Sequence, residues 1–384
     1  MTVDRSYPPT HQYSLFTMKP TGPLKERLEI IDSEFPWFFN GSRLLDVASN
    51  WGFFSFHYAE NFKEVVGIDF NKKCVDFCNQ RNKHSHLTFE HTSFRDFSSP
   101  YAFDKVFLGN VAHHLFLDAG DWSWLAKLAA FSDEEVLIEG AMSTNCKDIY
   151  DLVPKNLHAE FNKFGEEIDR YFELIKKVKT TSYTPDRYLM LYRKRHQLPK
   201  HQLKELKIKK VYSVQDFKVF ETPGNKIAKV FIRDPQALQI WNGLMRVRLA
   251  GFSPIATPLI GEIYVGARHV GWLEDKLLGE PYKYFENEKQ IWNLICQHGM
   301  FLAKNGYVDL DTATINFNKK TNLLFDKSCV FPINKLLPES VDVMPVLFNQ
   351  SYRMRGAYVS DVVSALKTKD SKQVEEAFRS GVIA

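Results

Sequence analysis

Residues 44–70 read LLDVASNWGFFSFHYAENFKEVVGIDF and decide the fold of the first half of the chain. An apolar run ends in Asp46, a turn through Asn50 and Gly52 opens a helix, and a second apolar run ends in Asp69. Asp46 and Asp69 are 23 residues apart, close to the spacing between the loop and the ribose-binding carboxylate of a Rossmann-type unit. A carboxylate at the end of the second strand can accept both ribose hydroxyls. The stretch therefore predicts a site for a nucleoside cofactor.

The turn between these two strands differs from that of a dinucleotide-binding unit. Where G-x-G-x-x-G is expected, the chain has Ala48, Asn50 and Gly52, so one of three glycines remains. A pyrophosphate needs close approach to the backbone at a free helix N-terminus, and Trp51 would crowd that approach. An adenosyl ligand without phosphates places fewer demands on the loop.

With the acid in the first strand, LLDVASNWGFFSF resembles motif I of class I S-adenosylmethionine (SAM) methyltransferases. FDKVFLGNVAHHL, at residues 103–115, resembles motif IV of the same family. The resemblance implies a Rossmann-like α/β sheet, SAM as the cofactor and methyl transfer as the activity. It also implies that these residues bind the cofactor: Asp46, Ala48, Asn50, Trp51, Gly52, Asp69, Phe70 and Asn110. A generic βαβ unit of another enzyme is the alternative.

The residues that follow continue the alternation of an α/β fold. Further strands are predicted at 86–94, 104–108 and 134–142, then a helix at 146–179 and a last hairpin within 180–195. Ligands of open α/β sheets bind at the carboxyl ends of the strands, so the exits of these strands predict one common cleft.

His113 and His114 directly follow the fourth predicted strand and are the candidate catalytic residues. A hydroxyl acceptor needs a base, and histidine titrates near neutral pH. A phosphate or carboxylate acceptor needs no base, and cationic side chains would hold it instead. Capping or packing of a helix is the plain alternative for the histidine pair. Arg187 resembles a substrate-side position of related methyltransferases, with a surface salt bridge as the equal alternative.

Length and composition describe a globular protein of two domains. The chain has 384 residues, of which 44% are hydrophobic. No apolar run approaches the roughly 20 residues that a membrane span needs, and the N-terminus lacks the layout of a signal peptide. Five scattered cysteines favour a reducing compartment, so a cytoplasmic protein is expected. Cys74 and Cys78 are one helical turn apart, which favours helix packing over metal binding.

Positive charge gathers in one segment near the middle of the chain. Residues 193–210, RKRHQLPKHQLKELKIKK, contain eight Lys or Arg residues and one Glu, whereas the whole chain has a net charge of +4. Such a segment can attract nucleic acid, a phosphorylated glycan or an anionic membrane surface, or it can be a solvated connection. We predict a basic linker at 193–210, with an N-terminal extension at 1–34, a methyltransferase domain at 35–192 and a second domain at 211–384.

The second domain begins with a predicted β-hairpin at 218–234, with its turn at Pro223-Gly224-Asn225. Lys229 in AKVF resembles the lysine of the V-A-I-K strand of protein kinases. An amphipathic helix is predicted at 291–306. Asp311 and Asn316 then match the Asp and Asn of the kinase catalytic loop H-R-D-L-x-x-x-N, and Asp326 stands where the D-F-G aspartate is expected.

The kinase resemblance implies a small, divergent α+β domain that uses ATP and Mg²⁺. In it Lys229 contacts ATP, Asp311 is the catalytic base, and Asn316 and Asp326 are metal ligands. The chain departs from the family pattern at several points. Asp309 replaces the histidine of H-R-D, Asp-Lys-Ser replaces D-F-G, no glycine-rich loop is present, and residues 235–252 contain no Glu to pair with Lys229.

The order of methyltransferase and kinase-like domain resembles the bacterial bifunctional methyltransferase-kinases that cap O-antigen polysaccharide. The resemblance implies that the chain phosphorylates and then methylates the end of a saccharide, so that its partner is a saccharide or phosphorylated acceptor. One alternative is a methyltransferase of RNA or a small metabolite whose kinase-like domain is inactive and serves substrate binding. A scaffold without enzymatic activity is the other alternative.

Overall fold

The computed structural model describes residues 23–180, 187–213, 217–231, 253–254, 256–277, 280–281, 283, 287–309, 318–324, 330–333 and 356–382. The described residues fall into two compact units. The first takes its residues from Met1–Phe97, Phe103–Trp122 and Ser132–Lys194. The second takes them from Ser98–Ala102, Ser123–Phe131 and Arg195–Ala384, so it includes two short segments of the first half of the chain.

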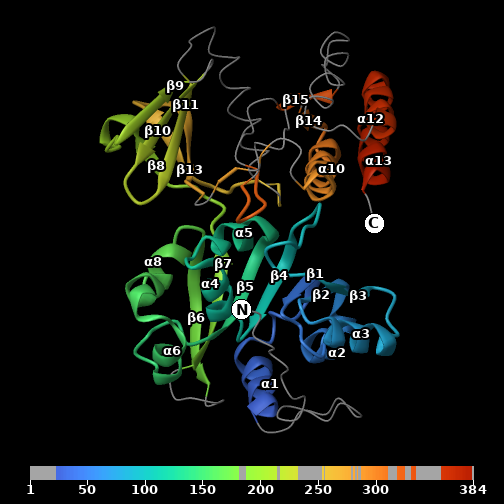
Figure 1. The fold of residues 1–384 in the computed structure, drawn as a ribbon, viewed down its shortest axis with the longest axis vertical. Coiled ribbons are helices and arrows are strands. Elements are labelled where there is room, and N and C mark those ends of the chain that lie inside the picture. The colour runs from blue at the N-terminus through green and yellow to red at the C-terminus, as the bar shows by residue number, and fades with distance from the viewer. Residues whose placement is uncertain are drawn as a thin grey trace. The chain divides into compact units, whose positions relative to one another are not determined.

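The first unit is built on a seven-stranded sheet with the order β3-β2-β1-β4-β5-β7-β6 (Figure 1). The strands are β1 (Gly41–Val47), β2 (Phe62–Asp69), β3 (Leu87–His91), β4 (Phe103–Gly109), β5 (Ser132–Gly140), β6 (Phe172–Thr180) and β7 (Arg187–Lys194). The first five are parallel, and β7 runs antiparallel to both β5 and β6. The chain leaves β1 toward β2 on one side and later returns to β4 on the other, so the strand order reverses between β1 and β4. This reversal is where open α/β sheets bind ligands.

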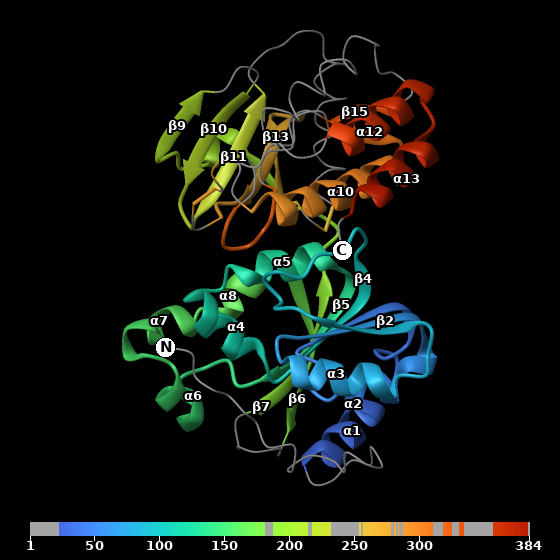
Figure 2. The ribbon, with the colours of Figure 1, turned by 45° about the vertical axis from the view of Figure 1, so that its right-hand side comes forward.

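Helices cover this sheet and complete its core. They are α1 (Pro23–Glu34), α2 (Phe53–His57), α3 (Lys72–Arg81), α4 (Ala112–Ala119), α6 (Lys147–Leu152), α7 (His158–Phe161) and α8 (Phe164–Ile168). Helix α3 packs along β2 and β3 (Figure 2). In α1, Leu24, Leu28 and Ile31 recur at helical spacing and join the core cluster that includes Phe53 and Phe54 of α2. The predicted extension at 1–34 therefore contains a helix of the domain core.

The strands predicted at 86–94, 104–108 and 134–142 are confirmed as β3, β4 and β5. The helix predicted at 146–179 is wrong over its last part, because residues Phe172–Thr180 form strand β6. This strand lies at the edge of the sheet, and a register irregularity between Leu174 and Lys176 breaks its period of two. The hairpin predicted within 180–195 is confirmed only for its second strand, β7, because its first strand, β6, spans Phe172–Thr180.

The second unit contains a six-stranded sheet with the order β8-β12-β13-β11-β10-β9. Its strands are β8 (Lys200–Gln202), β9 (Lys210–Ser213), β10 (Phe217–Thr222), β11 (Lys226–Phe231), β12 (Leu259–Val265) and β13 (Arg268–Asp275). The hairpin of β10 and β11 turns through Gly224 and Asn225, both with positive φ, as a tight hairpin turn requires. The segment predicted as a basic linker contains the end of β7, all of β8 and the start of β9.

Helices α10 (Glu288–Lys304), α12 (Gly356–Thr368) and α13 (Ser371–Gly381) supply most of a hydrophobic core in this unit. They lie side by side in both views (Figures 1 and 2). Gly299 of α10 faces the ring of Phe378, and a Cβ at this glycine would lie 2.6 Å from the ring. Helix α5 (Trp124–Phe131) and the short pair β14 (Tyr307–Asp309) and β15 (Val330–Pro332) also belong to this unit. No helix in the described ranges is long and apolar enough to cross a membrane.

Candidate functional site

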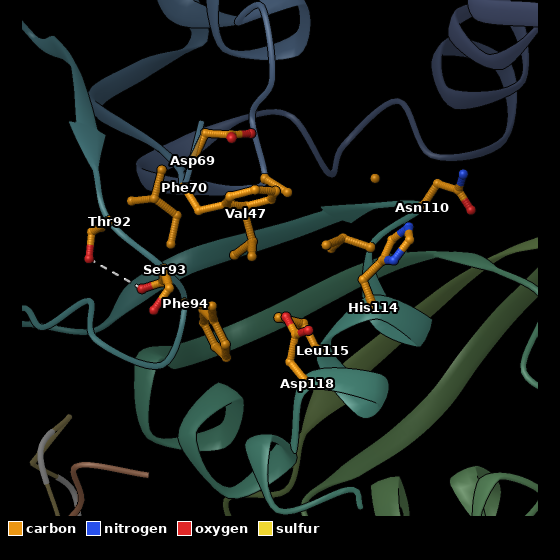
Figure 3. A pocket seen from close by; sticks show the side chains of 14 residues that line it. Val47, Asp69, Phe70, Thr92, Ser93, Phe94, Asn110, His114, Leu115 and Asp118 are labelled. Atoms are coloured by element: carbon orange, nitrogen blue, oxygen red, sulfur yellow. Dashed lines mark hydrogen bonds between the residues drawn. The ribbon is translucent and has the colours of Figure 1, made fainter. Parts of the chain in front are cut away.

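A pocket of about 560 Å³ opens at the carboxyl ends of β1, β2, β3 and β4 (Figure 3). Its position is the one predicted from the strand exits, on both sides of the point where the strand order reverses. Its volume lies within the range of roughly 300–1,000 Å³ that is common for small-molecule sites. The residues that line it are Val47, Ala48, Ile68, Asp69, Phe70, Thr92, Ser93, Phe94, Gly109, Asn110, Val111, His114, Leu115 and Asp118.

The loop after β1 keeps the left-handed backbone of a glycine-rich loop, although only one of the three glycines remains. Ala48, Asn50 and Gly52 have φ values of 58°, 51° and 75°, so all three are left-handed at the positions compared with G-x-G-x-x-G. Asparagine tolerates this conformation, whereas alanine is strained in it. At Gly52, an added Cβ would lie 2.8 Å from Cys78 Sγ and 2.9 Å from the ring of Phe89. Ala48 is therefore strained in this turn, whereas Asn50 adopts the left-handed backbone readily. Gly52 is required because a side chain would have no room there.

Asp69 is the carboxylate at the end of β2 that the spacing predicted. Its Oδ2 accepts the N–H of Asn50 at 2.8 Å, and its Oδ1 accepts the N–H of Asn71 at 2.7 Å. Burial raises the pKa of Asp69, whereas these two N–H groups and the charge of His91 act to lower it. Each carboxylate oxygen keeps a further lone pair, so the group can still accept two hydrogen bonds from a ligand.

Asp46 lies beneath the loop and does not line the pocket. Its Oδ2 accepts a hydrogen bond of 2.6 Å from Ser55 Oγ of α2, and the residue is buried. Burial raises the pKa of Asp46 to about 7, Ser55 opposes that shift, and the charge of Asp69 adds to it. Asp46 thus holds α2 against β1, and its predicted contact with the cofactor stays a prediction.

Asn110 stands at the end of β4 with a left-handed φ of 60°. Its N–H donates to the carbonyls of Leu108 and Glu139, each at 3.1 Å. The side-chain Oδ1 is buried and accepts no hydrogen bond from any described residue. A buried acceptor left without a donor costs about 1–3 kcal/mol. Because Asn110 lines the pocket, a bound ligand can supply the missing donor.

The two predicted histidines occupy different environments on α4. His114 lines the pocket, whereas His113 is 4% exposed and does not line it. The two rings are 4.1 Å apart. Only His114 is therefore placed to meet an acceptor, and Asp118, one turn further along the same helix, also lines the pocket. Sequence reasoning missed Asp118, although a spacing of four on a helix starting at a strand exit would have indicated it.

The apolar lining includes an exposed aromatic ring. Phe70 is 60% exposed, and His91 Nε2 donates to its carbonyl at 3.0 Å, so its backbone is held while its ring stays accessible. Thr92, Ser93 and Phe94, on the exit of β3, complete this side of the pocket (Figure 3). These three were not predicted one by one, but the rule that ligands meet strand exits covers them.

The remaining predicted residues of the loop serve its packing. The ring of Trp51 meets Phe77 of α3 edge-on, with centroids 5.0 Å apart. Cys78 Sγ lies 3.6 Å from the carbonyl of Asn50, and Cys74 Sγ lies 3.5 Å from the Oδ1 of Asn50. The two cysteines thus pack α3 against the loop, as the sequence indicated.

Arg187, a substrate-side candidate, belongs to a buried charge cluster. Glu139 on β5 is completely buried, and Arg27 Nε of α1 lies 3.1 Å from its Oε1. Burial raises the pKa of Glu139, while the charges of Arg27 and Arg187 lower it. Arg187 does not line the pocket. Arg187 thus lies near a buried carboxylate, which differs from the surface salt bridge considered as its alternative, and its substrate-side role stays a prediction.

In the second unit, Lys229 lies on β11 and its Nζ is 2.5 Å from Oε1 of Glu274. Lys229 stands opposite Trp272 of β13, so Glu274, two residues on, shares its face of the sheet. Residues 235–252, where the kinase resemblance places the partner helix, contain no Glu, and a neighbouring strand supplies the carboxylate instead. Asp311, Asn316 and Asp326 lie outside the described residues.

The strand order and the pocket at the carboxyl ends of the parallel strands define the first unit as a Rossmann-like domain of the class I methyltransferase type. Residues 44–131 match a family model described as "Methyltransferase domain". The chain therefore contains a SAM-dependent methyltransferase domain, followed by a second sheet domain.

Several solved structures are similar to the chain at low identity. N-methyltransferase NodS from Bradyrhizobium japonicum WM9 is 16% identical, with 44% of this chain and 93% of that chain covered and a TM-score of 0.35. Magnesium protoporphyrin IX methyltransferase (ChlM) from Synechocystis PCC 6803 is 17% identical, with coverages of 45% and 85% and a TM-score of 0.35. The bifunctional kinase-methyltransferase WbdD is 14% identical, with coverages of 93% and 87% and a TM-score of 0.32. No curated protein matches the sequence.

Proposed function

We propose that the pocket at the carboxyl ends of β1, β2, β3 and β4 binds SAM and that methyl transfer takes place beside His114. The observation that carries this proposal is Asp69, a carboxylate held by two backbone N–H groups at the end of β2, with lone pairs left for two ribose hydroxyls. The accessible ring of Phe70 suits an adenine, because a flat base stacks on an aromatic ring. The buried Oδ1 of Asn110 suits a hydrogen-bond donor of the ligand.

When bound, SAM supplies a methyl group activated by a sulfonium. The chain has to align the acceptor with this methyl group and, where the acceptor is a hydroxyl, to accept its proton. His114 can accept the proton of a hydroxyl acceptor, because its imidazole lines the pocket and a neutral imidazole is a common general base in enzymes. With an acceptor that is already an anion, His114 would instead donate a hydrogen bond to that anion. Both roles place the same side chain next to the acceptor.

We expect the substitution Asn110→Gly to weaken SAM binding by up to about tenfold, because a typical hydrogen bond contributes roughly 0.5–1.5 kcal/mol. Glycine accepts the left-handed φ of 60° at this position, so the backbone is retained. The unliganded variant loses a buried acceptor without a partner, so its free energy of unfolding stays level or rises. Isothermal titration with SAM and thermal unfolding measure the two effects.

A variant that binds SAM more weakly but has an equal or higher free energy of unfolding has lost a side chain that serves ligand binding at the expense of stability. A variant that binds SAM as tightly as the wild type would remove Asn110 from the site. A variant that loses affinity and stability together would reassign Asn110 to a structural role. Binding of SAM to neither protein would overturn the proposal for the whole pocket.

For the second unit we propose ATP-dependent phosphorylation of the acceptor that the first unit then methylates. The specific observation is the pair of Lys229 and Glu274 on adjacent strands, which holds the ammonium group on one face of the sheet. A lysine held by a carboxylate is the arrangement that positions nucleotide phosphates in kinases. Asp311, Asn316 and Asp326 would complete the catalytic and metal-binding set. The saccharide end is proposed from the sequence resemblance alone.

We expect Lys229→Met to abolish measurable binding of Mg·ATP in a titration of the full chain and to leave SAM binding intact. Lys218→Met is the matched control, because Lys218 lies on β10 beside the strand of Lys229 and faces the opposite side of the sheet. In the assay with an oligosaccharide acceptor, methylation by the wild type requires Mg·ATP, and methylation by the Lys229 variant is lost.

Methylation without ATP, or equal ATP binding by all three proteins, would contradict the phosphorylation step.

Binding of RNA with a steep salt dependence would favour the alternative of a methyltransferase of RNA. The structure already commits part of the basic segment to other contacts. Arg193 pairs with Glu135 at 3.0 Å, and Lys194 donates to the carbonyl of Ser132 at 2.7 Å. Burial lowers the pKa of Lys194 to about 8.

A further inference from the structure

Glu60, His84 and His86 meet at the edge of the sheet that is remote from the pocket. Glu60 lies on the short 3-10 helix Ala59–Asn61, which leads into β2, and both histidines lie in the connection from α3 to β3. One potential ligand atom from each side chain lies within 4.8 Å of the others. No local sequence pattern indicates this group, because Glu60 is separated from the histidines by the whole of β2 and α3.

The hydrogen bond of His86 leaves a lone pair for a ligand, and His84 faces a carboxylate oxygen of Glu60. His86 Nε2 donates to the carbonyl of Ala59 at 3.1 Å, since a carbonyl can only accept, and the lone pair of this ring is therefore on Nδ1. In a metal-bound histidine, the ring nitrogen that does not bind the metal usually donates a hydrogen bond, often to a carbonyl, and this bond fixes the orientation of the ring. His84 Nδ1 lies 2.9 Å from Oε1 of Glu60, so the carboxylate and this imidazole already face each other.

The backbone that carries the histidines is held in place. The N–H of His84 donates to Asn82 Oδ1 at 2.9 Å, and Asn82 Nδ2 donates to the carbonyl of Leu87 at 2.6 Å. The carbonyl of His86 accepts the N–H of Val65 of β2 at 2.8 Å. Both histidines are thus attached to the sheet before any ligand arrives, which lowers the entropy lost on binding.

We propose that Glu60, His84 and His86 form a surface site for a divalent transition metal ion, with Zn²⁺ as the best match. Two imidazoles and one carboxylate are the ligand types of zinc, and solvent can supply the fourth ligand because the side chain of Glu60 is 77% exposed. The site lies at the amino ends of β2 and β3, whereas the pocket lies at their carboxyl ends. At about 3.3 Å per residue, the eight residues of β2 separate them by roughly 25 Å.

At this distance the ion takes no part in methyl transfer. It would link the segment before β2 to the segment before β3, and so stabilise these two neighbouring strands. Asp69 and Thr92 lie at the opposite, carboxyl ends of the same strands. An ion that binds the folded chain raises the free energy of unfolding by mass action. The site is therefore a structural clamp that strengthens as free Zn²⁺ rises.

The test is a titration of the full wild-type chain with Zn²⁺, in parallel with His84→Gln, Glu60→Gln and the control His196→Gln. His196 is an exposed histidine of the second unit and lies outside the cluster. We expect the wild type and the control to bind one more Zn²⁺ than the two cluster variants, or to bind it at least about tenfold more tightly. Zn²⁺ should also raise the unfolding temperature of the wild type and the control more than that of the variants.

Equal stoichiometry, affinity and thermal shift in all four proteins would overturn the site and leave only a hydrogen bond between the imidazole of His84 and the carboxylate of Glu60. So would a wild type that binds no Zn²⁺. Both cluster variants replace side chains that are at least partly exposed, and circular dichroism of the metal-free proteins verifies that they fold.

Discussion

Asp69→Asn is expected to weaken SAM binding by at least about a hundredfold. The carboxylate at the end of β2 keeps lone pairs for two ribose hydroxyls, and hydrogen bonds to a charged group contribute roughly 1.5–3 kcal/mol each. Since about 1.4 kcal/mol corresponds to a factor of ten in affinity, the loss of both bonds accounts for this change. The amide also presents an NH₂ group to the N–H of Asn50 or Asn71, so the loop after β1 is held less firmly. Isothermal titration with SAM and S-adenosylhomocysteine measures the effect.

Asp76→Asn is the matched control for this experiment. The substitution is again carboxylate to amide, but Asp76 lies on the surface of α3 and pairs with Lys72 at 2.7 Å. Surface ion pairs of this kind contribute little to stability. We expect wild-type SAM affinity for Asp76→Asn. Wild-type affinity for a folded Asp69→Asn would show that the ribose is bound elsewhere, and the assignment of this pocket would fail.

Asp46→Asn is expected to stabilise the protein at pH 8 and to have little effect near pH 4. Burial raises the pKa of Asp46 to about 7 from its ordinary value of 3.8, so the folded chain binds this proton more tightly than the unfolded chain does. The stability of the wild type therefore falls as pH rises from about 4 to 7, and no further loss from this group occurs above that. Because a tenfold change in proton affinity corresponds to about 1.4 kcal/mol, the loss is on the order of 4 kcal/mol.

The asparagine variant lacks this titration and still offers an oxygen to the hydroxyl of Ser55. Urea unfolding of the wild type and of Asp46→Asn at pH 4, 6 and 8 measures the difference in the free energy of unfolding. We expect this difference to grow with pH, and Asp76→Asn to show no such growth. A constant difference across the three pH values would mean that the folded and the unfolded chain bind the proton of Asp46 equally tightly, so that burial does not raise its pKa.

Local features of the sequence were enough to predict most of the first sheet. The apolar runs that end in Asp46 and Asp69 are β1 and β2, and the exits of β3 and β4 line the pocket as expected. The turn at Pro223-Gly224-Asn225 was also predictable, because its glycine and asparagine adopt positive φ. The residues of strand β6 resemble a helix in sequence, because an edge strand with exposed Leu174 and an irregular register has no clear period of two.

The candidate site was predicted less completely than the fold. The sequence predicts the same role for Asp46 and Asp69, yet Asp46 lies beneath the loop and Asp69 lines the pocket. It also predicts the same role for His113 and His114, although successive residues on a helix point about 100° apart. Nothing in the sequence distinguishes such neighbours, because the packing of α2 and α4 on the sheet decides which of them meets solvent.

The sequence by itself determined where the carboxylates and amides of the site stand, since strand ends and turns depend on residues close together in the chain. Only the tertiary structure decided which of these side chains open into the pocket, and why Asn110 keeps an acceptor without a donor. It also supplied the partner of Lys229 from a neighbouring strand, and it brought Glu60 to His84 across an intervening helix and strand. Those contacts join residues more than twenty positions apart, so they depend on strand order and register, which no local pattern records.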